Sequence, residues 1–134
     1  MTVSIAKFDA LSWTTPNLPP DLSPELREQA MAVQRKGLAA GEGGFFASHV
    51  VMPPGQVTVP HSHDHSELVV ILAGSMVFDD GDGSTELVEN DAATISAGQV
   101  YGFTVGPDGV SFLLVRTGKA VSSIASGAAA SEPA

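Results

Sequence analysis

The chain has 134 residues, of which 43% are hydrophobic, and its six basic and fifteen acidic residues give a formal net charge of -9. This length suits one domain with a complete core. The lack of cysteine excludes disulfides and thiolate chemistry, and the scarcity of lysine and arginine argues against nucleic acid or a membrane surface as a partner. Because no signal-like segment opens the chain and no apolar run is long enough to span a membrane, we expect a cytoplasmic protein.

The first 44 residues read as an N-terminal arm that contains one short helix. Residues 14–25 include four prolines and should be extended and irregular. Ser23 followed by a proline is typical of a helix start. Apolar residues at helical spacing then predict a helix over about Pro24 to Lys36, with Gly37 as its stop.

Residues 45–117 read as the folded body of the protein. Runs of Val, Ile, Phe and Thr alternate there with Gly, Pro and Asp, which predicts strands separated by tight turns. The expected strands cover residues 45–52, 56–62, 67–74, 75–80, 84–89, 92–96, 100–105 and 110–117. So many short strands without intervening helices favour an all-β sandwich or barrel. Residues 118–134 are dominated by Ala and Ser, and we expect a low-complexity, frayed tail.

The densest group of candidate ligands is the segment HSHDHSE, from His61 to Glu67. Alternate residues of a strand share a face at roughly 7 Å spacing, so His61 and His63 can converge on one ion. Glu67 can join them only if the chain bends, and Asp64 to Ser66 are suitable turn residues. We therefore interpret His61, His63 and Glu67 as metal ligands. The simpler alternative is a solvated surface turn that is rich in histidine.

This segment resembles the first motif of the cupin superfamily, which reads Gly, five residues, His, one residue, His, three or four residues, Glu, six residues, Gly. Every fixed position is filled, by Gly55, His61, His63, Glu67 and Gly74. The resemblance covers about residues 45–116. It implies a cupin-type jelly-roll β-barrel with one divalent metal ion (Fe, Mn, Ni or Zn), which the two histidines and the glutamate hold inside the barrel. It also implies a homodimer, often formed by exchange of N-terminal strands.

The second cupin motif is degenerate. Gly98 fits it, but Asn90 and Ser96 replace a glycine and a proline, and Tyr101 takes the position of the fourth metal ligand, a histidine. Three roles are open for an inward-pointing Tyr101. It can stand beside an open metal site as a proton donor or acid–base group, it can ligate the metal as a phenolate, or it can fill space in a degenerate site. In an enzyme we expect Tyr101 and Glu67 to be the catalytic residues.

Three further side chains are candidates for the cavity wall. His49 lies on an early strand, where a purely structural role is equally open. His65 should lie in the turn near the mouth of the site. Phe103 shares the strand parity of Tyr101 and should face the same interior, where packing is the commoner role of a phenylalanine.

Two functions compete on this evidence. The first is a metal-dependent enzyme with dioxygenase-, isomerase- or lyase-type chemistry on a small organic substrate inside the barrel. The alternative is a non-catalytic binding or sensing cupin with a structural or vestigial metal site, which the missing histidine of the second motif favours. Arg116 is the only basic residue between Phe45 and Thr117, so an anionic substrate would depend on the metal for positive charge. We favour the enzyme.

Overall fold

The computed structural model describes residues 2–15, 18, 20–119 and 122–124. In these ranges the chain forms two short 3-10 helices (Phe8–Ala10 and Glu42–Gly44), one α-helix and eight strands. In chain order the α-helix and the strands are α1 (Pro24–Met31), β1 (Gln34–Ala40), β2 (Phe46–Met52), β3 (Val57–His63), β4 (Glu67–Asp79), β5 (Ser84–Val88), β6 (Ala92–Ile95), β7 (Tyr101–Arg116) and β8 (Ser122–Ile124). Within the described part of the chain, no helix is long and apolar enough to cross a membrane.

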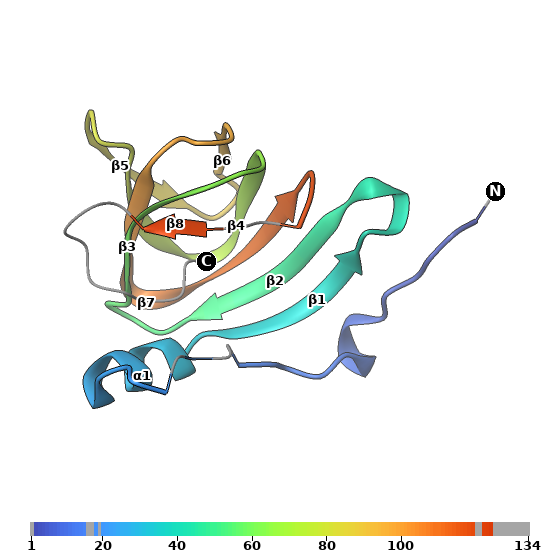
Figure 1. The fold of residues 1–134 in the computed structure, drawn as a ribbon, viewed down its shortest axis with the longest axis horizontal. Helices are drawn as coiled ribbons and strands as arrows, with labels where there is room; N and C mark the ends of the chain where they lie inside the picture. Colours follow the sequence, from blue (N-terminus) through green and yellow to red (C-terminus); the bar gives the residue numbers. More distant parts are fainter. Residues whose placement is uncertain (1, 16–17, 19, 120–121, 125–134) are drawn as a thin grey trace.

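Strand β7 is the centre of the fold (Figure 1). It spans 16 residues and pairs antiparallel with β2, β3 and β4. Strand β1 borders β2, β8 borders β3, and β5 and β6 both pair with β4. The strands thus form one antiparallel sheet that curls around its own interior, with β1 and β8 at the two ends of its main path.

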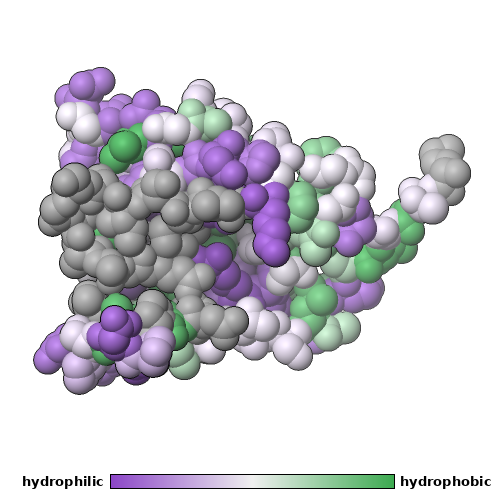
Figure 2. Space-filling view, viewed as in Figure 1, coloured by the Kyte–Doolittle hydropathy of each residue, from purple (hydrophilic) through white to green (hydrophobic). Residues whose placement is uncertain are grey.

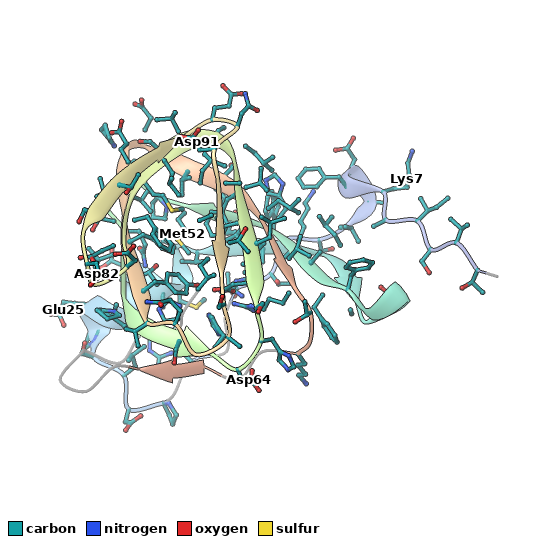
Figure 3. The ribbon with its side chains drawn as sticks, turned by 90° about the horizontal axis from the view of Figure 1, so that it is seen from above. Lys7, Glu25, Met52, Asp64, Asp82 and Asp91 are labelled. Atoms are coloured by element: carbon teal, nitrogen blue, oxygen red, sulfur yellow. The ribbon has the colours of Figure 1, made fainter. Side chains whose placement is uncertain are left out.

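The core lies inside the curled sheet. Along β4 the side chains alternate between buried and half-exposed from Glu67 to Ile71, as expected for a strand with one face inside. In Figure 3, Met52 marks this interior, whereas Asp82 and Asp91 lie at its periphery. The fold is therefore all-β, as the strand pattern predicts, and it is the jelly roll that the cupin resemblance implies, although its barrel is not closed.

The N-terminal region differs from the sequence prediction. Helix α1 ends at Met31 instead of Lys36, and an unpredicted strand, β1, follows it. This strand pairs with β2 along its length, and Arg35 exchanges two backbone hydrogen bonds with Thr14 of the arm (N···O 2.8 and 3.0 Å). Pairing with β2 and the arm outweighs the weak local preference of these residues for a helix.

Strands β4 and β7 each join two segments that the sequence predicts as separate strands. The register between them shifts next to Gly74. Gly74 has a φ of 76°, and a Cβ there would overlap the carbonyl oxygen of Gly109 on β7. Only glycine permits this close crossing of the two strands. This requirement is the physical reason for the last glycine of the first motif.

Part of the predicted tail is also a strand. Residues 122–124 form β8, which pairs with His61–His63 of β3, so the expectation of a frayed tail is wrong for these three residues. Residues 125–134 lie outside the described residues. Both β1 and β8 fall outside residues 45–117, and yet they belong to the same sheet.

An aromatic cluster fastens the arm to the outer face of β1 and β2. The buried Lys36 ammonium donates to the carbonyl oxygen of Phe8 at 2.8 Å and lies 3.9 and 4.8 Å from the ring centroids of Phe8 and Trp13. His49 packs against both rings, at centroid distances of 4.9 and 5.8 Å. Trp13 thus anchors the arm on the sheet. The residues before this cluster project from the body and expose apolar surface (Figure 2).

Candidate functional site

Strand β3 places both histidines of the first motif in the interior. His61 is fully buried and His63 is 5% exposed, and their ring centroids lie 4.9 Å apart with nearly perpendicular planes. In the register of β3 and β7, His61 stands opposite Tyr101. Because His61 and His63 are two residues apart on one strand, their imidazoles face the same side of the sheet, as their spacing in the sequence predicts.

The predicted bend brings Glu67 to the same place. Strand β3 ends at His63, a turn marked by Asp64 in Figure 3 follows, and β4 begins with Glu67. The Glu67 carboxylate is 2% exposed. Its Oε1 accepts a hydrogen bond from the Tyr101 hydroxyl, and its Oε2 accepts one from Nε of Arg116 at 2.8 Å. The carboxylate is therefore buried and accepts hydrogen bonds from two sides, which is how a buried carboxylate is stabilised.

His61 presents a nitrogen to the interior that has no partner among the described residues. Its Nδ1 lies 2.7 Å from the carbonyl oxygen of Val59, which can only accept, so the ring proton belongs on Nδ1. The opposite nitrogen, Nε2, is then a buried lone pair without a hydrogen bond. Burial lowers the pKa of His61, so the ring stays neutral. A neutral imidazole whose other N–H is held by a backbone carbonyl is the usual form of a metal-ligating histidine.

Tyr101, which belongs to the second motif, contacts side chains of the first. Its ring stacks on Phe78 (centroids 5.2 Å apart, planes 14° apart) and its centroid is 4.4 Å from that of His61. Burial raises the pKa of the phenol, and the negative charge of Glu67 raises it further. The hydroxyl thus keeps its proton and donates it in the hydrogen bond to Glu67. The three roles that the sequence leaves open for Tyr101 stay open, with its hydroxyl as a hydrogen-bond donor to Glu67 in this arrangement.

The site fits a divalent metal in its chemistry. Two imidazoles and one carboxylate suit Fe, Mn, Ni or Zn, and the lone pair on Nε2 of His61 is the kind of buried acceptor that a cation satisfies. In the side-chain arrangement described, however, no three His, Asp or Glu residues of the described part of the chain form a ready ligand set. The guanidinium of Arg116 lies among these side chains, with its Nη2 3.3 Å from Nε2 of His63 and its Nε donating to Glu67.

The other sequence candidates lie at different places. His49 faces outward under the arm, because its neighbour Val50 points into the core, so the expectation that His49 lines the cavity is corrected. His65 lies in the β3–β4 turn as expected, with Nε2 3.8 Å from a carboxylate oxygen of Asp64. Phe103 faces the interior, where it packs edge-on against Phe112.

A cavity of about 380 Å³ opens beside the site rather than at its centre. Tyr101 and Phe103 lie in its wall together with residues of β3, β4 and the β4–β5 turn, but neither histidine of the motif does. Phe103 thus lies in the wall of this cavity, and Tyr101 belongs both to that wall and to the buried group of His61, His63 and Glu67.

Sequence reasoning missed two arginines of the interior. The sequence does not indicate that Arg116 belongs to the site, because only the β4–β7 register, which pairs it with Glu67, brings it there. Arg35 stands opposite the fully buried Val50 and therefore on the inner side of β1, and its charge acts to lower the pKa of Tyr101. Because the sequence predicts a helix over residues 34–36, it gives no signal that the side chain of Arg35 faces the interior of a sheet.

The fold and the site together define the class of the protein, an open antiparallel jelly roll with a buried His/His/Glu group on consecutive strands. The family model described as "Cupin domain" matches residues 48–116, just over half of the chain. The chain therefore belongs to the cupin family.

Individual proteins similar to this chain share a third or less of its residues over the matched part. A nitrosourea synthase of Streptomyces achromogenes subsp. streptozoticus is 32% identical over 89 residues, which cover 66% of this chain and 19% of that protein. The chain thus spans about a fifth of the length of this curated relative. Among solved structures, the polyketide cyclase RemF of Streptomyces resistomycificus matches with a TM-score of 0.72 at 20% identity, over 92% of this chain and 85% of that one. A cupin sugar phosphate isomerase of Silicibacter pomeroyi matches with a TM-score of 0.67 at 20% identity, over 90% and 80%.

Proposed function

We propose that the protein is a metal-dependent enzyme that transfers protons on a small organic substrate, an isomerase- or lyase-type reaction. His61, His63 and Glu67 would hold the metal, and Tyr101 would act as the acid–base group. The observation that carries the proposal is the buried, unpartnered Nε2 of His61, whose tautomer is set by Val59. An acceptor that is left unsatisfied in a core costs about 1–3 kcal/mol, and a bound cation removes that cost.

The residues of the chain supply the remaining chemistry. A bound divalent metal would act as a Lewis acid that polarises an oxygen of the substrate. The Tyr101 hydroxyl, protonated because burial raises its pKa, would be the proton donor to a substrate bound beside His61, His63 and Glu67. Glu67 accepts the hydrogen bond of that hydroxyl and orients it. Buried apolar side chains such as Phe78 exclude water from the phenol.

Metal content is the first test. Untagged protein purified without chelator should contain about one metal per chain by inductively coupled plasma mass spectrometry, and a His61→Ala, His63→Ala double variant should contain none. Tyr101→Phe serves as the matched control, because it should keep the metal. If added Fe, Mn, Ni or Zn binds the wild type no better than the double variant, the proposal is wrong, and a binding cupin with a vestigial site becomes the better description.

The reaction class is tested separately. Metal-loaded protein is incubated in D₂O with a panel of small ketones, hydroxyketones and keto acids, and deuterium incorporation is followed by mass spectrometry. We expect incorporation that Tyr101→Phe reduces by about 10²-fold or more, the usual contribution of a general acid or base. Oxygen consumption without deuterium incorporation would instead assign dioxygenase-type chemistry to the same site.

A further inference from the structure

The guanidinium of Arg116 binds two of the three proposed metal ligands. Its Nε donates to Oε2 of Glu67 at 2.8 Å, and its Nη2 lies 3.3 Å from Nε2 of His63. The three side chains are almost completely withdrawn from solvent, with Arg116 the most exposed at 15%. Arg116 and Glu67 are direct partners in the β4–β7 ladder, so the sheet itself holds the two side chains together.

These contacts use the same electron pairs that a metal would need. Arginine is always charged and can only donate, so the nitrogen of His63 that faces it must offer its lone pair. That lone pair cannot serve Arg116 and a metal at once. The Nε2 of His63 is also only 3.7 Å from Oε1 of Glu67, which places the guanidinium and any shared metal within a few ångströms of each other. Two cations at that separation in a buried site repel strongly.

We propose that Arg116 is a built-in competitor of the metal. In the metal-free protein its guanidinium supplies the positive charge that the buried Glu67 needs, and a divalent cation binds to His61, His63 and Glu67 only by displacing it. Arg116 therefore sets the metal affinity of the site without being a ligand. This inference rests on the proposed metal site, and it goes beyond it by assigning a role to a residue that neither cupin motif contains.

Isothermal titration calorimetry of Zn²⁺ and of Mn²⁺ into the full, chelator-stripped chain tests the competition. Arg116→Met removes the charge and the donors at similar volume, and it should bind each metal at least about tenfold more tightly than the wild type, because each 1.4 kcal/mol of removed competition is tenfold in affinity. Arg116→Lys keeps the charge and should stay near the wild type. Arg35→Met is the matched control, since it removes an interior positive charge from β1, a strand that pairs with β2 and not with the strand of Glu67, and its effect should be clearly smaller.

A second measurement on the wild type covers the case in which Arg116→Met does not fold. The Nε–H resonance of Arg116 in an ¹⁵N-labelled sample should report its hydrogen bond to Glu67 and should shift on addition of one equivalent of Zn²⁺. A His61→Ala sample should show no such shift. If Zn²⁺ binds in a His61-dependent manner and this resonance does not change, Arg116 is not displaced and the inference is wrong.

The outcomes separate this inference from the proposed function. Equal or weaker metal binding by Arg116→Met overturns the competition and leaves a metal enzyme possible, with Arg116 as a residue that positions Glu67. Tighter binding by Arg116→Met without any turnover supports the competition and counts against the enzyme. No metal binding by either protein overturns both.

Discussion

The hydroxyl of Tyr101 connects the two cupin motifs through its hydrogen bond to Glu67. Tyr101→Phe removes that bond and keeps the ring stack on Phe78, because the two rings have the same shape. A hydrogen bond to a charged group contributes about 1.5–3 kcal/mol, so we expect the free energy of unfolding to fall by roughly that amount. Urea denaturation of the two proteins measures it. An unchanged midpoint would mean that the hydroxyl does not hold Glu67 in solution.

Gly74 shows how one residue can determine the path of two strands. Gly74→Ala would drive a methyl group into the carbonyl of Gly109 and also strain a backbone with φ of 76°. We expect a loss of more than about 3 kcal/mol, or no folded protein. Gly81→Ala is the control, because Gly81 has a similar φ of 93° but open space around its Cβ position. It should lose only about 1–2 kcal/mol, from backbone strain alone. Equal losses in thermal denaturation would contradict the steric argument.

At the scale of elements, the docking of the arm depends on the ionisation of His49. Burial lowers the pKa of His49 below its ordinary value of 6.5, and the nearby charge of Lys36 lowers it further. The folded state therefore binds this proton less readily than the unfolded state does. The contribution of neutral His49 to the stability of the folded state is complete above pH 6.5, and it is lost as the pH falls through the lower pKa of the folded state. Acid should thus loosen the arm from β1 and β2.

Trp13, the only tryptophan of the chain, reports this docking directly. We expect its fluorescence to change in a titration whose midpoint lies below pH 6.5, since an imidazolium beside the indole alters the contact. His49→Gln keeps a polar side chain of similar size that does not titrate, and it should flatten the curve. A curve that is the same in both proteins would assign the titration to another group.

The parts of the site that follow from strand periodicity could be predicted from the sequence. The period of two places His61 and His63 on one face and gives Tyr101 and Phe103 a shared interior. The bend before Glu67 follows from turn residues. His49 shows the limit of this reasoning, because periodicity says that His49 and Val50 face opposite sides and cannot say which side is inside. That choice depends on the packing of the whole sheet.

Long-range pairing accounts for what the sequence could not predict. The contact between Arg116 and Glu67 joins residues that are 49 positions apart, and no local pattern encodes a register across that distance. The sequence predicts a helix at the start of β1, because these residues become a strand only through their pairing with β2. The all-β fold class was predictable because it follows from local patterns. The presence of Arg35 and Arg116 in the site was not, because it follows from the pairing of the whole sheet.

At the scale of the whole molecule, the homodimer that the cupin resemblance implies stays a prediction. The N-terminal arm exposes Val3 and Ile5 by 83% and 79%, and alternate apolar residues of this kind suit an added strand on a second chain. Light scattering at micromolar concentration should therefore give twice the mass of one chain. A Val3→Ser, Ile5→Ser variant should shift the equilibrium toward the monomer. A monomeric wild type would contradict the prediction.

The central place of β7 has a consequence for how the chain comes to fold. Strands β2, β3 and β4 all pair with β7, and β7 follows β1 to β6 in the chain. A ribosome that has made β1 to β6 therefore holds apolar strands whose main partner has not yet emerged. Closing such distant pairs is slow, because the entropy of long loops is lost before any contact compensates for it. We expect nascent chains that stop before Tyr101 to remain protease-sensitive and to engage chaperones, and chains extended past Arg116 to become resistant in a single step.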